Sequence, residues 1–443
     1  MPIDDTTRAV QSTSRSTEVR KVVLSSYLGS LLEYYDFLLY GTASALVFGP
    51  VFFSGMSSAA GTVAAFGTFA AGYLARPLGG VLFGHLGDRV GRKSMLVLSL
   101  VLMGTASILI GLVPSSTSIG SWAPVLLVFL RVVQGIALGG EWGGAVLMSL
   151  EHAEGKSRGF IGAFTYIGAP SGALLGTLAM AVVSQLPEAD FLQWGWRIPF
   201  LLSAVMLAIG LYVRSSVSES PVFLAAAERA AAEAKEGRRS APPVLEVLGR
   251  WRVVLSVGLA GFAGFAVQTM FATFAITYAV GNGGDRSTIL AAHSLSYVFA
   301  IVFGLVFARL SDSVGRRPVM IGGLVGIMVL TFPLFALLER GTFMSALVAF
   351  SLFVICTAAN HGTLPAYITE RFGTRTRYTG SSLGYQLATL LGGGLTPLVL
   401  ASLFASSGGS IIPIGVFVIG LCLVSVVAIA LSGESKDNDL VTV

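Results

Sequence analysis

Residues 22–48 form an apolar stretch that is long enough to cross a membrane, yet it carries two carboxylates near its middle. A transmembrane helix needs about 20 mostly apolar residues to cross a hydrocarbon core about 30 Å thick. The two acids, Glu33 and Asp36, are three residues apart, so they share one face of a helix. An acid at the bilayer centre costs on the order of 3 kcal/mol. The stretch therefore predicts a helix that lines a polar path through a membrane protein.

The rest of the chain has the same apolar character. Only 12% of its residues are charged and 54% are hydrophobic, whereas soluble proteins average roughly 25% charged residues. We therefore expect an all-α polytopic membrane protein with twelve transmembrane helices. The predicted spans are residues 22–48, 61–86, 95–113, 122–149, 158–183, 197–214, 252–280, 287–309, 318–337, 342–366, 377–403 and 409–431.

Two features of the termini and the cysteines agree with this class. The first 20 residues lack the short apolar run and the cleavage site of a signal peptide, so we expect the first span to remain as an anchor. Cys356 and Cys422 both lie inside predicted spans, and no pair of histidines has the spacing of metal ligands. We expect no disulfide, no metal and no cofactor.

The distribution of Lys and Arg predicts how the chain is oriented. All but five of the 28 lie in the two terminal tails and the loops that share their side. The opposite loops hold only Arg286 and Arg340, and the other three lie within or at the mouth of spans. By the positive-inside rule, both termini are expected in the cytoplasm, with the chain crossing the cell membrane many times.

A charged break and an internal repeat divide the chain into two halves. The segment from Gly84 to Lys93 is echoed by the segment from Ala308 to Arg317, each with an Asp, then a Gly three residues later and two basic residues. Two related six-span halves with a binding site between them are typical of secondary transporters. The expected parts are a cytoplasmic tail (1–21), a six-helix bundle (22–214), a cytoplasmic helical linker (215–251), a second six-helix bundle (252–431) and a tail (432–443).

Several motifs resemble those of a known family. The loop from Gly84 to Lys93 and residues 131–135 (RVVQG) are similar to motifs of the major facilitator superfamily. Further motifs resemble the metabolite:proton symporter family, whose members carry alpha-ketoglutarate, shikimate, or proline and betaine. They are residues 33–37 (EYYDF), 76–80 (RPLGG), 139–144 (GGEWGG) and 194–200 (WGWRIPF), with residues 37–41, 380–386 and 392–397 looking closest to the shikimate branch.

The charges inside the spans are candidates for proton coupling. Glu33, Asp36 and Arg76 lie within one turn of the middle of their spans, and Arg131 and Glu141 lie about 7 Å to either side along the fourth span. An acid that is balanced between burial and a nearby Arg can bind a proton on one side of the membrane and release it on the other. We expect Asp36 first, Glu33 second and Glu141 third in this role, tuned by Arg131. The alternative is a static ion-pair network that holds the first, second and fourth helices together.

Other polar residues in the spans are candidates for substrate binding. Arg76 and Arg131 could hold a carboxylate, for which a planar guanidinium is well suited, although Arg76 could also be structural; Arg197 is expected to reach the membrane surface. The remaining candidates are Tyr34, Tyr40, Tyr166, Gln268, Tyr297, Asn360, Tyr385 and Gln386. For each of these, helix packing is the alternative. Two further groups are expected to be structural: His293 and His361, and the glycines Gly135, Gly139, Gly140, Gly143 and Gly144.

The repeated loops are expected to form a cytoplasmic gate. In the superfamily that they resemble, this loop joins the halves when the cavity opens outward, and an acid after the fourth span completes the charge network. Such pairs are worth about 1 kcal/mol each, so they can break in every transport cycle. The alternative is that the charges only keep the loops inside. The gate candidates are Asp88, Arg89, Arg92, Lys93, Glu151, Asp312, Arg316 and Arg317.

The sequence as a whole predicts a secondary active transporter and not an enzyme. The leading hypothesis is proton-coupled symport of a small organic acid, shikimate-like or a dicarboxylate, by alternating access. The alternatives are proton-coupled uptake of a zwitterion such as proline or betaine, and an uncoupled facilitator. We expect a monomer whose partners are the organic acid, protons and the lipid bilayer, and we expect no nucleic acid.

Overall fold

The computed structural model describes residues 5–152, 157–217, 243–374, 376–394 and 396–437, together with residues 219, 224 and 228. Every regular element in these ranges is a helix, which confirms the all-α class. The first half contains α1 (Asp5–Ala43), η1 (Ser44–Phe48), α2 (Gly49–Phe52), α3 (Ser58–Val90), α4 (Arg92–Leu112), α5 (Ser116–Ile119), α6 (Trp122–His152), α7 (Arg158–Val183), α8 (Glu188–Asp190), η3 (Phe191–Gly195) and α9 (Arg197–Ser215).

The second half follows the linker, most of which lies outside the described residues. Its elements are α11 (Pro243–Gly249), α12 (Trp251–Met270), η4 (Phe271–Ala275), α13 (Ile276–Gly281), α14 (Arg286–Val314), α15 (Arg316–Leu338), α16 (Phe343–Thr369), α17 (Arg377–Thr389), η5 (Leu390–Gly394), α18 (Thr396–Ser406) and α19 (Ile412–Leu431). The elements η1, η3, η4 and η5 are π-helical turns that interrupt long helices. Such turns often occur at functional sites.

Each of the twelve predicted spans coincides with helix. By length and hydropathy alone, nine helices of the described part could cross a membrane, or ten if the bent pair in residues 20–52 is one span. The two predicted spans that are not among these ten are 61–86 and 377–403. They fall on α3 and on the interrupted helix from α17 to α18. Since α1 begins at Asp5, most of the expected N-terminal tail continues the first helix.

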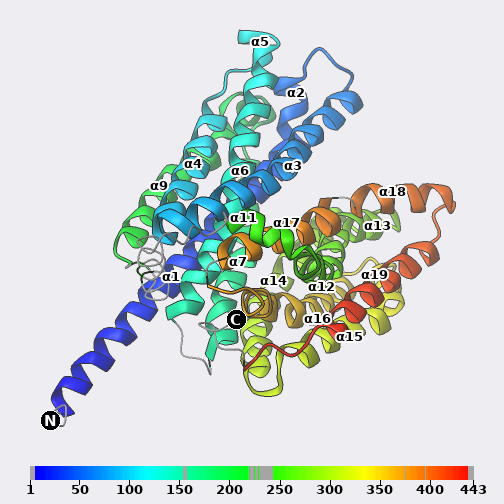
Figure 1. Ribbon diagram of the computed structural model, residues 1–443. Helices are drawn as coiled ribbons and strands as arrows, with labels where there is room; N and C mark the ends of the chain where they lie inside the picture. The colour runs from blue at the N-terminus through cyan, green and yellow to red at the C-terminus, as the bar shows by residue number, and fades with distance from the viewer. Residues whose placement is uncertain are drawn as a thin grey trace.

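The two halves form two bundles that diverge from a shared junction (Figure 1). At the junction, α17 packs against α3 and α6, and α7 packs against α14. The hydroxyl of Tyr378 donates to the carbonyl of Gly140 (2.9 Å), and Nε2 of Gln386 donates to the carbonyl of Gly139 (3.1 Å). These two bonds join the halves.

One end of the molecule carries the loops at residues 91, 315 and 374 together with the C-terminal segment. We call this end the terminal face.

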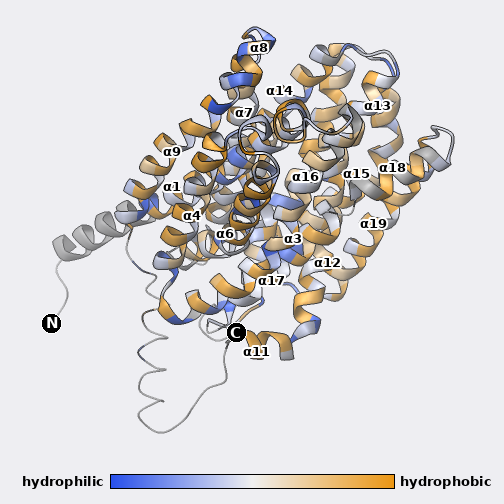
Figure 2. Ribbon diagram, turned by 90° about the horizontal axis from the view of Figure 1, so that it is seen from above, coloured by the Kyte–Doolittle hydropathy of each residue, from blue (hydrophilic) through white to orange (hydrophobic). Residues whose placement is uncertain are grey.

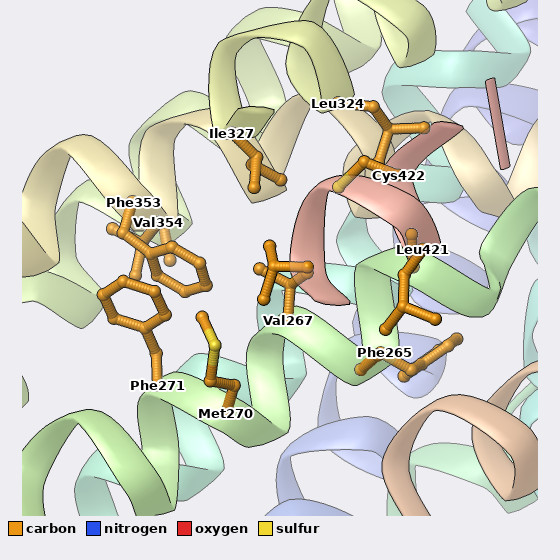
Figure 3. Packing of buried hydrophobic residues seen from close by; sticks show 14 of the residues in the cluster. Phe265, Val267, Met270, Phe271, Leu324, Ile327, Phe353, Val354, Leu421 and Cys422 are labelled. Carbon is orange, nitrogen blue, oxygen red and sulfur yellow. The ribbon is translucent and has the colours of Figure 1, made fainter. Parts of the chain in front are cut away.

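Hydrophobic side chains both fill and surround the bundles. In the second half, the rings of Phe271 and Phe353 stack with centroids 3.4 Å apart, beside Met270 and Val267 (Figure 3). Outer helices such as α9 and α19 carry hydrophobic residues on their exposed surfaces (Figure 2). Because lipid is as apolar as these side chains, van der Waals packing and hydrogen bonds hold membrane helices together.

The glycines of α6 have the predicted packing role. A Cβ atom at Gly139 would overlap the carbonyl of Arg76 in α3, and one at Gly144 would lie 2.9 Å from the Leu96 side chain. The glycines at 135, 140 and 143 have similarly close neighbours. This confirms that small residues let α6 approach α3, α4 and α17 closely.

Candidate functional site

Asp36 lies at one end of a chain of buried hydrogen bonds. Its Oδ2 accepts from the hydroxyl of Ser107 in α4 (2.5 Å), and its Oδ1 accepts from the hydroxyl of Ser203 in α9 (2.8 Å). Nε2 of Gln134 in α6 donates to the Ser107 hydroxyl (2.6 Å), and a terminal nitrogen of Arg131 donates to Oε1 of Gln134 (3.1 Å). We call these five residues the Asp36 relay. It connects a buried carboxylate to a buried guanidinium through neutral groups.

Glu33 lies one helical turn before Asp36, in a different environment. Its side chain is 2% exposed, and its Oε2 has no hydrogen-bond partner within the described residues. A charged carboxylate with an unpaired buried oxygen is costly in an apolar interior. Glu33 is therefore a second acid that could hold a proton, as its position in the sequence predicts.

Glu141 is paired with Arg214, the last residue of the predicted span 197–214. Its Oε1 accepts from Arg214 of α9, which also donates to the carbonyl of Leu96. Gly29 of α1 leaves room for this pair, since a Cβ there would overlap Arg214 and lie 2.9 Å from Oε1 of Glu141. We expected Arg131 to influence Glu141, but the direct partner of Glu141 is Arg214. This ion pair favours a static, structural role for Glu141 over a role in proton coupling.

Arg76 and Arg131 both lie near Phe37, among aromatic rings. Cζ of Arg131 lies 4.2 Å from the ring centroid of Tyr40 and 5.5 Å from that of Phe37. Cζ of Arg76 lies 4.5 Å from the ring centroid of Tyr73 and 5.1 Å from that of Phe37. We call these five residues and Phe69 the arginine–aromatic cluster. Within the described part of the chain neither arginine forms an ion pair, so both keep donors for an anion.

A separate cavity lies between the two halves. It has a volume of about 20 Å³, which is room for a water molecule. The rings of Trp142 and Tyr385 stack beside it with centroids 3.7 Å apart, and the edge of Phe265 meets Tyr385 at 5.2 Å. Its wall consists of Tyr34, Trp142, Thr165, Tyr166, Ala169, Phe265, Gln268, His361, Leu364, Pro365 and Tyr385. A larger ligand requires the halves to separate here.

The structure brings together only some of the expected substrate-binding residues. Tyr34, Tyr166, Gln268 and Tyr385 line the cavity between the halves, whereas Arg76 and Arg131 belong to the arginine–aromatic cluster.

The other four candidates do not line the cavity, and one of them, Tyr40, belongs to the arginine–aromatic cluster. The hydroxyl of Tyr40 is bonded to that of Thr68 (2.7 Å), and Gln386 is bonded across the junction. Tyr297 packs against His293, and Asn360 is fully buried outside the cavity wall. These contacts favour a packing role for Gln386 and Tyr297. Tyr40 lies beside Arg131, and both polar side-chain atoms of Asn360 have no partner among the described residues.

Sequence reasoning missed several residues of both sites. Gln134 had a signal, because it follows Arg131 by three residues in a recognised motif. Ser107 and Ser203 had none, since a serine in a membrane helix commonly bonds its own backbone. In the cavity wall, Trp142, Thr165, Phe265 and His361 were missed because an aromatic or lone polar residue in a span is most simply explained by packing.

The gate candidates of the second half bridge the halves at the terminal face. Oδ1 and Oδ2 of Asp312 accept from the backbone nitrogens of Gly159 (2.8 Å) and Phe160 (2.9 Å), in the first turn of α7. A terminal nitrogen of Arg316 donates to Oδ1 of Asp312 (2.7 Å). Arg316 also binds both carboxylate oxygens of Glu370, at 2.9 and 3.3 Å. A negative charge at the start of a helix is favourable because of the helix dipole.

In the first half, Arg92 is the gate candidate that reaches across. It is fully buried and donates to the carbonyl of Thr374 in the second half (3.2 Å). Arg89 is exposed.

Two candidates depart from the expected role in joining the halves. The ammonium of Lys93 donates to the carbonyl of Ser215 (3.0 Å), and Nε of Arg317 donates to that of Ile429 (3.0 Å), so each bonds within its own half. The side chains of Asp88 and Glu151 lie outside the part that the structure describes.

Comparisons with known proteins agree with this arrangement. The family model of the Major Facilitator Superfamily matches residues 27–397. A shikimate transporter of Escherichia coli (strain K12) is 38% identical over 438 residues, which cover 97% of this chain and 98% of that protein. A proline/betaine transporter of the same organism is 34% identical over 410 residues, covering 89% and 80%. A structure of the proton:xylose symporter XylE bound to 6-bromo-6-deoxy-D-glucose superposes with a TM-score of 0.76 at 18% identity, covering 96% and 98%, and shows the fold alone.

Proposed function

Because the chain belongs to the Major Facilitator Superfamily, we propose that it is a proton-coupled symporter that carries a small organic acid by alternating access. Its relatives are transporters, so the protein is a multi-pass membrane transporter and not an enzyme. The excess of Lys and Arg on the terminal face supports an orientation with both termini in the cytoplasm.

The Asp36 relay is the observation that carries the proposal. While Asp36 is ionised, its negative charge offsets the positive charge of Arg131, to which Gln134 and Ser107 connect it. Protonation of Asp36 removes that negative charge and leaves Arg131 more attractive to an anion. Binding of a proton and binding of an anion therefore favour each other, and this favourable coupling is reciprocal. Glu33 is the second proposed proton carrier.

The arginine–aromatic cluster supports an acid as the substrate. Arg76 and Arg131 can present planar, bidentate donors to a carboxylate. The rings around them already lie within 4.2–5.5 Å of a guanidinium carbon, which disfavours a further cation there such as the quaternary ammonium group of betaine. The similarity to a shikimate transporter points to a shikimate-like acid, whereas the proline/betaine relative keeps a zwitterion as the alternative.

The contacts at the terminal face supply the proposed gate. Asp312 holds the first turn of α7, Arg316 and Glu370 hold Asp312 in place, and Arg92 reaches Thr374. We propose that these contacts close the terminal face while the substrate enters from the opposite side. They break when the halves rock about the binding site, which opens the path inward.

The proposal is tested by uptake into proteoliposomes that contain the purified protein. An inward proton gradient should drive accumulation of radiolabelled shikimate, and a protonophore should abolish it. A dicarboxylate such as alpha-ketoglutarate, and the zwitterions proline and betaine, serve as competitors. Uptake that the protonophore leaves unchanged would indicate an uncoupled facilitator. Accumulation of proline or betaine without accumulation of any acid would establish the alternative substrate class.

A further inference from the structure

His361 lines the cavity between the halves, and its two ring nitrogens differ in their partners. Its Nδ1 lies 3.2 Å from the carbonyl oxygen of Thr357, one turn earlier in α16. A carbonyl oxygen can only accept a hydrogen bond, so Nδ1 carries the proton and Nε2 of the neutral ring is an acceptor. Nε2 is buried and has no partner among the described residues. Among the described residues, the cavity wall contains no Asp or Glu that would hold a charged ring in place.

The imidazole ring is fixed in this orientation by its neighbours. Tyr166 of the other half stacks over it with ring centroids 5.8 Å apart, and Phe265 meets it edge-on at 4.9 Å. The expectation of a purely structural histidine therefore accounts for Nδ1 only. A buried acceptor with no donor costs about 1–3 kcal/mol.

Thr165 brings a second polar atom without a partner to the same wall, from the other half. Its side chain is 1% exposed, and its Oγ1 makes no hydrogen bond within the described residues. Ser171 and Thr177 of the same helix differ, because each donates to the carbonyl four residues earlier at 2.8 Å. The hydroxyl of Thr165 is thus left able to donate to a group in the cavity.

We propose that this cavity is a binding subsite for a hydroxyl group of the transported molecule. The ligand hydroxyl donates to Nε2 of His361 and accepts from the hydroxyl of Thr165, so that one oxygen satisfies both atoms and bridges the halves. The cavity has room for about one such oxygen, and the stacked rings of Trp142 and Tyr385 provide an apolar surface beside it.

This inference rests on the proposed transport of an organic acid and narrows its substrate class. It selects hydroxylated acids over acids of the same shape that lack the hydroxyl group. A site that is built to bind a hydroxyl discriminates strongly against a ligand without it, because the polar groups of the site are then left unpaired. The carboxylate and the hydroxyl would be recognised by different groups, namely the arginines and the pair of Thr165 with His361.

The test compares two probes in binding to the purified full-length protein: shikimate, and 1-cyclohexenecarboxylate, which has the same ring and carboxylate without hydroxyl groups. His361→Phe keeps an aromatic ring against Tyr166 and Phe265, and Thr165→Val keeps the shape of the threonine. Each should weaken shikimate binding about tenfold and leave the binding of 1-cyclohexenecarboxylate unchanged. His361→Gln, whose amide oxygen can replace Nε2 as an acceptor, should restore part of the preference.

His293→Phe is the matched control, because His293 is also a span histidine packed on rings but does not line the cavity. It should keep the full preference for shikimate. If the protein binds both acids but shows no preference, or if His361→Phe and Thr165→Val keep the preference, the hydroxyl subsite is wrong while the transport proposal stands. If neither acid binds, the hydroxyl subsite is wrong and a shikimate-like acid is ruled out as the substrate, while transport of another organic acid stands. A preference that responds to these variants while uptake ignores a protonophore would support the subsite and refute the proton coupling.

Discussion

The interiors of the two halves differ in charge. The first half buries Glu33, Asp36, Arg76, Arg131 and Glu141 deep in its spans. The second half has no Asp, Glu, Lys or Arg between residues 318 and 338 or between 343 and 369, and its charged residues lie near the ends of its helices. Its polar groups at the cavity are neutral, such as His361 and Gln268.

This difference indicates that the two halves, although they share one architecture, have different roles in transport. Charges that respond to a proton or an anion are concentrated in the first half, where the Asp36 relay connects them. The second half offers neutral hydrogen-bonding groups and rigid aromatic packing, which suit recognition of shape and hydroxyl groups. The following predictions test this difference in roles, beginning with the largest expected effect.

Arg131→Gln should have the largest effect on transport. It removes a buried charge that contributes both to the relay and to the proposed carboxylate site, and hydrogen bonds to charged groups are worth about 1.5–3 kcal/mol each. Uptake of shikimate at a subsaturating concentration should fall by about 100-fold. Arg340→Gln, at an exposed arginine, is the control and should stay near the unaltered rate. Uptake by Arg131→Gln within threefold of that rate would show that the charge is not needed.

Ser107→Ala should separate the role of the Asp36 relay from that of the charges. It removes two hydrogen bonds of the relay and leaves every charged residue in place. Asp36 and Gln134 would lose their shared hydroxyl, so the KM for the acid should respond less to pH, and gradient-driven uptake should fall by about tenfold. Ser99→Ala is the matched control, because Ser99 is buried in the same helix but donates to the carbonyl of Leu96. A full pH response of KM in Ser107→Ala would refute the relay.

Asp312→Ala tests whether a charged residue of the second half stabilises the first half at the terminal face, where Asp312 accepts from the first turn of α7. Removal of the carboxylate frees the first turn of α7, so amide hydrogen exchange in residues 159–165 should become about fivefold faster, in line with a cap worth roughly 1 kcal/mol. Asp285→Ala removes a cap of α14 and should leave the exchange of α7 unchanged. Equal exchange in α7 for both variants would contradict an interaction between the halves.

The smallest expected effect concerns the exposed cap itself. The hydroxyl of Ser287, then the backbone nitrogen and hydroxyl of Thr288, hold the pKa of Asp285 at about 2, below its ordinary value of 3.8. A lowered pKa in the folded state stabilises the fold above pH 3.8, and this contribution is lost as the pH falls toward 2. Helicity of the first turn of α14 should decrease slightly in that range, as measured by hydrogen exchange. The same pH response in Asp285→Asn would assign the change to another group.

The fold could be predicted from the sequence because its signals are long and repeated. Apolar runs fix the helices, and the two loops with an Asp followed by Gly and two basic residues mark the division into halves. The π-helical turns and the N-terminal extension of α1 were not predicted, since no composition signal distinguishes them from ordinary helix.

The site could be predicted only in part. Rare residue types in an apolar context, such as Asp36 and Arg131, were identified because burial of a charge needs a reason. Their partners were not identified, because Ser107, Ser203 and Arg214 become neighbours only through the packing of helices that are distant in sequence. His361 shows the same limit, since only the structure reveals that one of its nitrogens is bonded while the other has no partner in the described part of the chain.

The most direct test of the central claim is transport by Asp36→Asn in proteoliposomes, measured as gradient-driven accumulation of shikimate and as exchange of labelled for unlabelled shikimate. Glu188→Gln, at an exposed acid, is the control and should keep both activities. The account predicts that Asp36→Asn loses accumulation while exchange continues, because the substrate site remains but its proton carrier is gone. Accumulation against a gradient by both Asp36→Asn and Glu33→Gln would contradict it.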